Sequence, residues 1–302
     1  MLPAKKIKFA ILLIAMVSLA IVAIVRFNDR QIPRPPLPVP NGYDAILRAG
    51  AIRSGTGELP DKPTQAELSA FVATNAEAFK LVRMGLQQEC RVPFGNFTNH
   101  LNELGSIKSL AVGLRSEGQL AELEGRTNDA AQIYLEAIHL GHEACRGGPL
   151  IDNLVGIACE AIGTGSLERI AGSLDAATSR SALREMTELE NRRENWGEIW
   201  KNEQAWMRAE YGPMPMGKLW EIIKARSIDW QKPMRLRSRA KVDRIQLQTR
   251  QLMLDLAARA FTLEQGKAPA DAAALVPSYL PETLRDPFTG TNLTRWRDGG
   301  AK

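Results

Sequence analysis

The sequence predicts an all-α protein with a single amino-terminal transmembrane helix, a proline-rich stalk and a helical body that ends in an extended tail. Three observations support this prediction. Seventeen uncharged, almost wholly apolar residues run from Phe9 to Val25. Beyond residue 63, apolar residues recur at the three-to-four spacing of amphipathic helices, and we find no convincing alternation of apolar and polar residues over five positions. Aromatics are only 6% of the chain, and alanine, leucine, glutamate and arginine are abundant, as in helical proteins.

The apolar run is the predicted membrane anchor, within residues 1–30. Seventeen helical residues extend over about 25 Å, whereas the hydrocarbon core of a bilayer is about 30 Å thick. Lys8 and Arg26 flank the run, and their long side chains can reach the headgroups and make a short span workable. The first predicted partner is therefore the lipid bilayer, contacted through Phe9 to Val25.

A cleaved signal peptide is the alternative interpretation of this segment. Ser18-Leu19-Ala20 fits the small-x-small pattern of a cleavage site, but the apolar run continues for five residues beyond it, which favours a retained anchor. Positive charges lie on both sides of the run, so the positive-inside bias is weak. Because long soluble domains translocate largely regardless of nearby charge, we expect a single-pass membrane protein with its body outside the cytoplasm.

Residues 31–62 are predicted to form a stalk and linker. Five of the eight residues from Pro33 to Pro40 are proline. Proline has no backbone N–H group and disfavours helix at the preceding residue, so this stretch extends at about 3.1 Å per residue, to about 25 Å. Residues 63–210 are then predicted to form a helical domain, and residues 211–302 a long basic helix with a carboxyl-terminal segment.

Local signals divide the remainder of the chain into helices. Thr64 and Glu67 match a capping box at the start of the first helix of the domain. Glycine and proline interrupt the helical pattern wherever they cluster. The predicted breaks lie at residues 93–95, 147–149 and 212–215, and the longest predicted helix spans residues 239–265.

Two of these predicted helices carry small residues and one aromatic at regular positions, namely Gly118, Ala121, Gly125, Ala130, Tyr134 and Ala137. Over residues 111–142 the pattern resembles one tetratricopeptide repeat. The resemblance implies two closely packed antiparallel helices, with Tyr134 filling the gap beside them. His142 stands where that family usually has proline, and no second unit follows. We therefore expect one helical hairpin rather than a peptide-binding array.

Residues 252–293 combine a long apolar helix with the motifs Leu275-Val-Pro277, Tyr279-Leu-Pro281 and Asp286-Pro-Phe-Thr-Gly290. This order resembles the carboxyl-terminal segment of type II secretion pseudopilins and of uncharacterised bacterial membrane-anchored proteins. The resemblance implies an extended tail that lies back across the long helix, and an association with secretion or pilus-like machinery. The prepilin cleavage pattern and the acidic calcium-binding loop of the pseudopilins are absent, so neither polymerisation nor a calcium site is carried over.

Residues able to do chemistry are sparse. His139, His142, Glu143 and Cys145 lie within two helical turns, and the two histidines share a helix face. Zinc normally takes three or four ligands from more than one element, and no partner motif is present. A Cys145–His100 pair also lacks a local signature. We predict no catalytic residue, metal or cofactor, and keep a hydrolase or metal-dependent enzyme using the His139/His142 region as the alternative.

Two other clusters of residues are expected to have structural roles. Glutamates and arginines alternate over residues 184–194, which predicts a solvated helix face with ion pairs. Five of the six tryptophans fall between Trp196 and Trp230, and Trp196 and Trp200 are one helical turn apart. Core packing is favoured there over an exposed surface for a partner or the membrane interface.

The three cysteines allow at most one disulfide, whose pairing the sequence does not determine.

The chain is strongly basic between Lys224 and Arg250. This stretch has a net charge of +7, whereas the whole chain has +5, so the remainder is slightly acidic. Such a concentration of charge is either a solvated helix face or a site for anionic headgroups or an acidic partner. The candidate residues of an anionic-surface site are Arg235, Arg237, Arg239, Lys241 and Arg244.

These features favour a membrane-anchored envelope scaffold or protein-interaction module over an enzyme. Besides the bilayer, its predicted partner is a protein or an anionic lipid surface. Nucleic acid is disfavoured as a partner, because a body outside the cytoplasm does not meet it.

Overall fold

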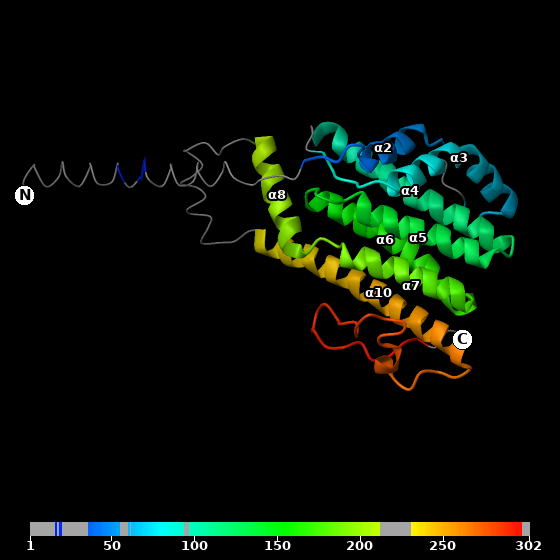
Figure 1. Ribbon diagram of the computed structural model, residues 1–302. Helices are drawn as coiled ribbons and strands as arrows, with labels where there is room; N and C mark the ends of the chain where they lie inside the picture. Colours follow the sequence, from blue (N-terminus) through cyan, green and yellow to red (C-terminus); the bar gives the residue numbers. More distant parts are fainter. Residues whose placement is uncertain are drawn as a thin grey trace, which may run out of the picture. The chain divides into compact units, whose positions relative to one another are not determined.

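A computed structural model of the chain describes residues 16, 18–19, 36–54, 60, 62–93, 97–211 and 231–297 (Figure 1). Over these residues the regular structure consists of eight α-helices and two short 3₁₀ helices, and the one strand-like pairing is an isolated bridge between Arg285 and Asn292. The prediction of an all-α protein is confirmed. The chain divides into two units, and we call the larger one, residues 37–203 and 230–302, the body.

Helix α2 (Gly42–Ile52) lies inside the segment that was expected to be a stalk and linker. The Asn41 side chain caps it by accepting a hydrogen bond from the backbone N–H of Tyr43. Tyr43 and Ile46 are fully buried in the core that α2 shares with α3 and α4. The structure thus differs from the linker prediction over α2. A helix of 11 residues gives a short apolar pattern, and tertiary packing rather than local propensity stabilises it.

Helices α3 (Gln65–Leu86) and α4 (Phe97–Leu123) complete this first core. The predicted capping box is confirmed, because Thr64 Oγ1 accepts from the Glu67 N–H at 3.3 Å and the Glu67 carboxylate accepts from the Thr64 N–H at 2.7 Å. The core also takes apolar side chains from α5 and α6. Its fully buried members include Phe79, Val82, Ile107, Leu110 and Leu114.

Helix α5 (Thr127–Glu143) follows α4 after a short turn and packs against it as the expected helical hairpin. Gly125 has φ +75° in this turn, a left-handed conformation that glycine adopts without strain. Tyr134 of α5 is fully buried, and a Cβ atom at Gly118 would overlap its ring. The Tyr134 hydroxyl donates to Glu122 of α4, which also binds Arg169. The small residue at 118 and the aromatic at 134 therefore fit each other.

Helix α6 (Leu150–Ile170) begins directly after the predicted break at residues 147–149. It packs more extensively on α5 than on any other helix. Glycines make this close approach possible, since a Cβ atom at Gly141 would lie 2.5 Å from the carbonyl oxygen of Gly156. Consequently α6 becomes the central helix of the body and also contacts α4 and α10.

The second core is built around α10 (Gln231–Gln265), which packs against α6 and α7 (Ala176–Asn191). Helix α8 (Trp196–Tyr211) follows α7. Of the two 3₁₀ helices, η1 (Ala171–Ser173) follows α6 and η2 (Ala272–Leu275) follows α10. The segment of α10 within the body thus belongs to the same compact unit as α6 and α7.

The carboxyl-terminal segment folds back along α10, as the spacing of its prolines led us to expect. Arg250 of α10 donates to the carbonyl oxygen of Arg285 at 2.7 Å, and Gln251 donates to that of Arg295 at 2.9 Å. Asp255, one turn further along α10, binds Arg297. The tail is thus held by side chains of the helix it covers.

The predicted anchor, Phe9 to Val25, lies outside the described residues except for Met16, Ser18 and Leu19, which are helical and exposed. Among the residues that the structure describes, one helix, Leu150–Ser173, is long and apolar enough to cross a membrane. More than half of that helix is buried within the body, as is typical of a core helix. The anchor therefore stays a prediction from the sequence.

Candidate functional site

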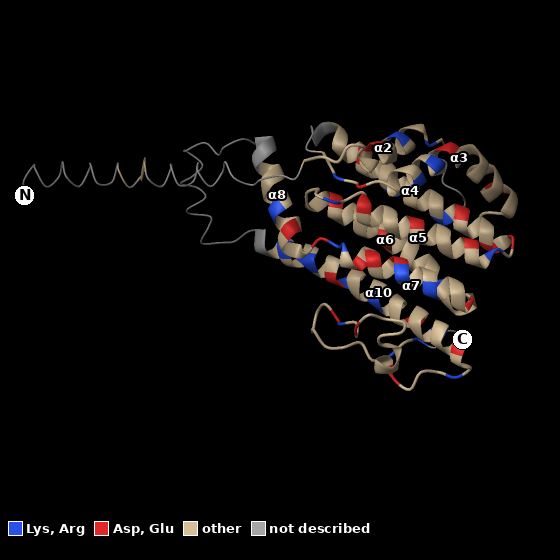
Figure 2. Cartoon of the chain, in the orientation of Figure 1, with Lys and Arg blue, Asp and Glu red and all other residues tan. Residues whose placement is uncertain are grey.

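Residues 231–250 of the basic stretch singled out from the sequence form the amino-terminal part of α10, and residues 224–230 lie outside the described residues. Figure 2 shows positively charged residues along this part of the helix. Ser238, Val242 and Ile245 are buried and fix which face of α10 points into the body. Arg237, Lys241 and Arg244 are exposed and follow each other at i, i+4 and i+7, so they lie on one face of the helix. We call these three residues the basic row.

The basic row has no acidic neighbours close enough to neutralise it. Over the described residues, no carboxylate lies within 4.0 Å of Arg237, Lys241 or Arg244. Met234 and Leu236, in the turn before the row, are 41% and 58% exposed. Uncompensated cations beside exposed apolar side chains are typical of helices that lie at a membrane surface.

The other two candidate residues of this site are placed differently. Arg235 lies over the ring of Trp200, 4.7 Å from its centroid, and so takes part in a cation–π contact with α8. Arg239 lies on the opposite side of α10 from the row, 3.6 Å from Asp243. The structure therefore brings together three of the five predicted residues and gives the remaining two partners within the body.

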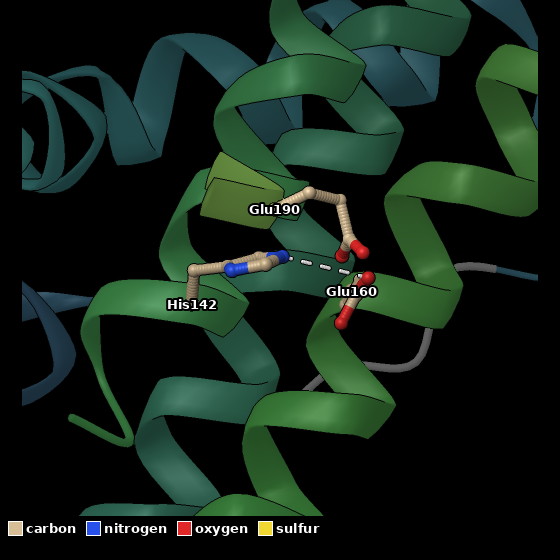
Figure 3. A group of neighbouring side chains, drawn as sticks. All are labelled: His142, Glu160 and Glu190. Atoms are coloured by element: carbon tan, nitrogen blue, oxygen red, sulfur yellow. Dashed lines mark ion pairs between the residues drawn. The ribbon is translucent and has the colours of Figure 1, made fainter. Parts of the chain in front are cut away.

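A second group of charges is buried where α5, α6, α7 and α10 meet. The carboxylate of Glu160 is 2% exposed and accepts hydrogen bonds from Arg193 and, at 2.6 Å, from the hydroxyl of Thr249. His142 Nε2 lies 3.5 Å from the same carboxylate (Figure 3). Burial favours the neutral acid, but the charge of Arg193 and the proximity of His142 outweigh it and lower the pKa of Glu160 far below its ordinary value.

Arg193 is the centre of this buried cluster. Its guanidinium bridges Glu160 of α6 and Glu190 of α7, and Glu190 also accepts from Gln246 at 3.2 Å and Arg250 at 3.4 Å, both on α10. Burial opposes the charge of Arg193, yet the two carboxylates raise its pKa. Residues 184–194 are thus not the fully solvated face that their alternating charges predicted, since Glu190 and Arg193 lie inside the body.

His142, Glu160 and Glu190 place three ligand atoms within 4.8 Å of one another, the spacing of a metal site (Figure 3). A metal would have to displace Arg193. One terminal nitrogen of Arg193 contacts His142 at 3.1 Å and the carboxylate of Glu160, and its Nε atom contacts Glu190. The hydroxyl of Thr249 occupies a further position on Glu160. The donor set is therefore satisfied by an arginine cation. The adjoining cavity, about 30 Å³, is large enough for about two water molecules.

The two histidines of the alternative enzyme hypothesis do not converge on one site. His142 joins the Glu160 cluster, whereas His139 faces α7, with Glu185 at 4.0 Å from its Nδ1 atom and Glu143 at 3.9 Å from its Nε2 atom. Burial lowers the pKa of His139 to about 4, with Glu143 opposing the shift. A neutral imidazole in this place accepts no hydrogen bond from the nearby side chains.

The remaining candidates also lie apart. His100 Nε2 is 2.9 Å from the carboxylate of Asp152, a fully buried side chain of α6, and its Nδ1 atom is 3.4 Å from Glu103. Cys145 contacts the carbonyl oxygen of His142, and all three cysteines are free thiols. Trp196 and Trp200 stack with centroids 6.3 Å apart, and Trp220 and Trp230 lie outside the described residues.

Compared with known proteins, the chain matches no protein-family model, no curated protein and no solved structure. A function therefore has to be inferred from the arrangement of its own side chains. Sequence analysis missed the Glu160–Arg193 pair, although one signal was present: Glu160 is a charged residue within the most apolar helix of the described body. A charge at such a position needs a partner from another element.

Proposed function

We propose that this protein is a membrane-anchored helical interaction module, whose basic row binds the anionic headgroups of a lipid surface. The observation that carries the proposal is the set of exposed cations at Arg237, Lys241 and Arg244, which have no carboxylate within 4.0 Å in the described part of the chain. The predicted anchor and stalk support it, because they tether the body to a bilayer. The tether is a single pass, with the body outside the cytoplasm.

The expected binding free energy explains why a basic row of this size acts together with a membrane tether. A cation close to an anionic membrane contributes about 1 kcal/mol, so three contribute about 3 kcal/mol, which corresponds to roughly a hundredfold in affinity. Such binding is weak for a free protein. An anchored body, however, meets the surface at an effective concentration of about millimolar, which makes weak contacts effective. The exposed side chains of Met234 and Leu236 add apolar contact with the headgroup region.

The surface interaction can be tested with a truncated chain that begins at Leu37 and so lacks the predicted anchor. A helix-dominated circular dichroism spectrum first shows that the chain is folded. We expect flotation with vesicles that contain phosphatidylglycerol and none with pure phosphatidylcholine. Binding should weaken steeply with salt, because the Debye length falls from about 10 Å at 0.1 M to about 3 Å at 1 M. Equal binding to both vesicles, or none to either, would contradict the proposal.

The anchor requires its own test on the full-length chain in membranes. We expect the protein to stay in the membrane fraction after alkaline extraction, and mass spectrometry of that protein to find Lys5 and Lys6. A mature chain that starts at Ile21 would show that the apolar run is a cleaved signal peptide. A reporter that is active only outside the cytoplasm, fused after Lys302, should be active; activity of a cytoplasmic reporter alone would reverse the topology.

A further inference from the structure

A groove of the body lies beside the carboxyl-terminal half of α10. Its volume is about 580 Å³, within the range of small-molecule sites. It is bounded by the end of α6 and η1, by α10 and by the tail that folds back on α10. Its walls include the methyl groups of Ala171, Ala258 and Ala268 and the ring of Trp296. Apolar surface therefore lines much of the groove.

One arginine of the groove lacks a carboxylate partner. Arg297 binds both Asp255 and Glu168, and Arg169 forms a two-contact pair with Glu122. The third arginine, Arg259, has no carboxylate within 4.0 Å over the described residues. These three arginines and three carboxylates sum to no net charge. Arg259 is therefore distinguished by its lack of a partner and not by an excess of positive charge in the groove.

Arg259 is also held in a defined position. Its Nε atom donates to the carbonyl oxygen of Leu174 at 3.1 Å, and this bond ties the side chain of α10 to the end of η1. Among the residues that the structure describes, the two terminal nitrogens have no acceptor. A guanidinium fixed in this way offers two parallel N–H donors, the geometry that matches a carboxylate.

From this geometry we infer that the groove is a binding site for a small carboxylate with an apolar body, whose carboxylate pairs with Arg259 and whose body lies against Trp296 and the alanine methyl groups. The two donors and the apolar walls each select one part of such a ligand. A neutral analogue satisfies the walls but cannot form charge-assisted hydrogen bonds with Arg259. The groove lies further along α10 than the basic row, and the inference does not depend on lipid binding.

The test uses the full-length protein in detergent and two probes of the same shape, benzoate and its neutral counterpart benzamide. Calorimetric titration should show saturable binding of benzoate at least about tenfold tighter than that of benzamide, because a hydrogen bond to a charged group contributes about 1.5–3 kcal/mol. Arg259→Gln should remove this preference, and Arg259→Lys, which keeps the charge but lacks the two parallel donors, should retain only part of it. Equal affinities for the two probes, or no saturable binding of benzoate, would overturn the inference.

Two further variants distinguish a site from a general effect of charge or folding. Arg126→Gln removes an exposed arginine outside the groove and should leave benzoate binding unchanged. Ala268→Trp adds bulk at an exposed position of the groove wall without disturbing the core, and should abolish binding even if Arg259→Gln fails to fold. Binding that survives in Ala268→Trp would place benzoate elsewhere and overturn the assignment.

Discussion

Two sets of charged side chains lie on or against α10, and their surroundings are opposite. In the buried cluster, which packs against α10, Glu160 is almost wholly and Arg193 largely removed from water, and every charge has an opposite charge or a hydroxyl beside it. In the basic row, Arg237, Lys241 and Arg244 are exposed, and no carboxylate of the described residues lies within 4.0 Å of them. A buried charge must be paired for the protein to fold, whereas an exposed one costs little and is free to meet a partner. The buried cluster is therefore expected to stabilise the fold, and the basic row to be available for binding.

The largest effect should come from breaking the buried cluster. Glu160→Leu leaves Arg193 buried with part of its charge uncompensated, and we expect the free energy of unfolding to fall by about 3–5 kcal/mol. Chemical denaturation monitored by circular dichroism measures the change. The double variant Glu160→Leu/Arg193→Leu should lose less than the sum of the single changes, because both charges are then gone. Simple additivity would mean that the two side chains are not coupled.

A somewhat smaller effect is expected in the α4–α5 hairpin, where the stabilisation is apolar rather than ionic. Tyr134→Ala removes a fully buried ring and should lower the free energy of unfolding by about 2–4 kcal/mol, because it leaves a cavity against Gly118. Tyr134→Phe keeps the ring and loses only the hydroxyl, which donates to Glu122 and accepts a long bond from Arg169, so about 1 kcal/mol is expected. An unchanged melting temperature in Tyr134→Ala would show that the ring does not hold the hairpin together.

Burial of His139 should make the free energy of unfolding depend on pH. Burial lowers its pKa to about 4, against about 6.5 in an unfolded chain, so the unfolded state binds more protons between these values. Stability from this residue is complete above pH 6.5 and is lost as the pH falls towards 4, by up to about 3 kcal/mol. Denaturation at a series of pH values should show this loss in the parent chain and a smaller one in His139→Gln. Identical pH profiles would mean that His139 does not titrate with folding.

The smallest effect on stability should come from the basic row. Reversal of Arg237, Lys241 and Arg244 to Glu changes exposed, unpaired side chains, so we expect the free energy of unfolding to stay within about 0.5 kcal/mol per site. Thermal melts of the truncated chain measure it. A cooperative loss of folding would show that these cations are structural and would remove the contrast with the buried cluster.

Local signals allowed much of the fold to be predicted from the sequence. The capping box at Thr64 and the break at residues 147–149 act over a few residues, and both occur where predicted. The proline-spaced tail is similarly local, since each proline restricts its own neighbour. Helix α2 was missed because its 11 residues become helical only by packing against α3 and α4.

The candidate sites were harder to predict because their residues are distant in sequence. Glu160 and Arg193 are 33 residues apart, and Thr249 is 89 residues from Glu160, so no motif links them. The basic stretch was visible as composition, but composition did not separate the exposed row from Arg235, which lies on Trp200. Which basic residues are exposed depends on how α10 is rotated about its axis and on its tertiary contacts.

The most direct test of the central claim compares two triple variants in one vesicle flotation experiment. The first reverses Arg237, Lys241 and Arg244 to Glu; the second reverses Lys80, Lys108 and Lys201, which are exposed elsewhere on the body, and so changes the net charge equally. If the basic row is the binding site, the first variant no longer floats with phosphatidylglycerol vesicles and the second floats like the parent chain. Equal loss in both variants would attribute binding to net charge alone and contradict the account.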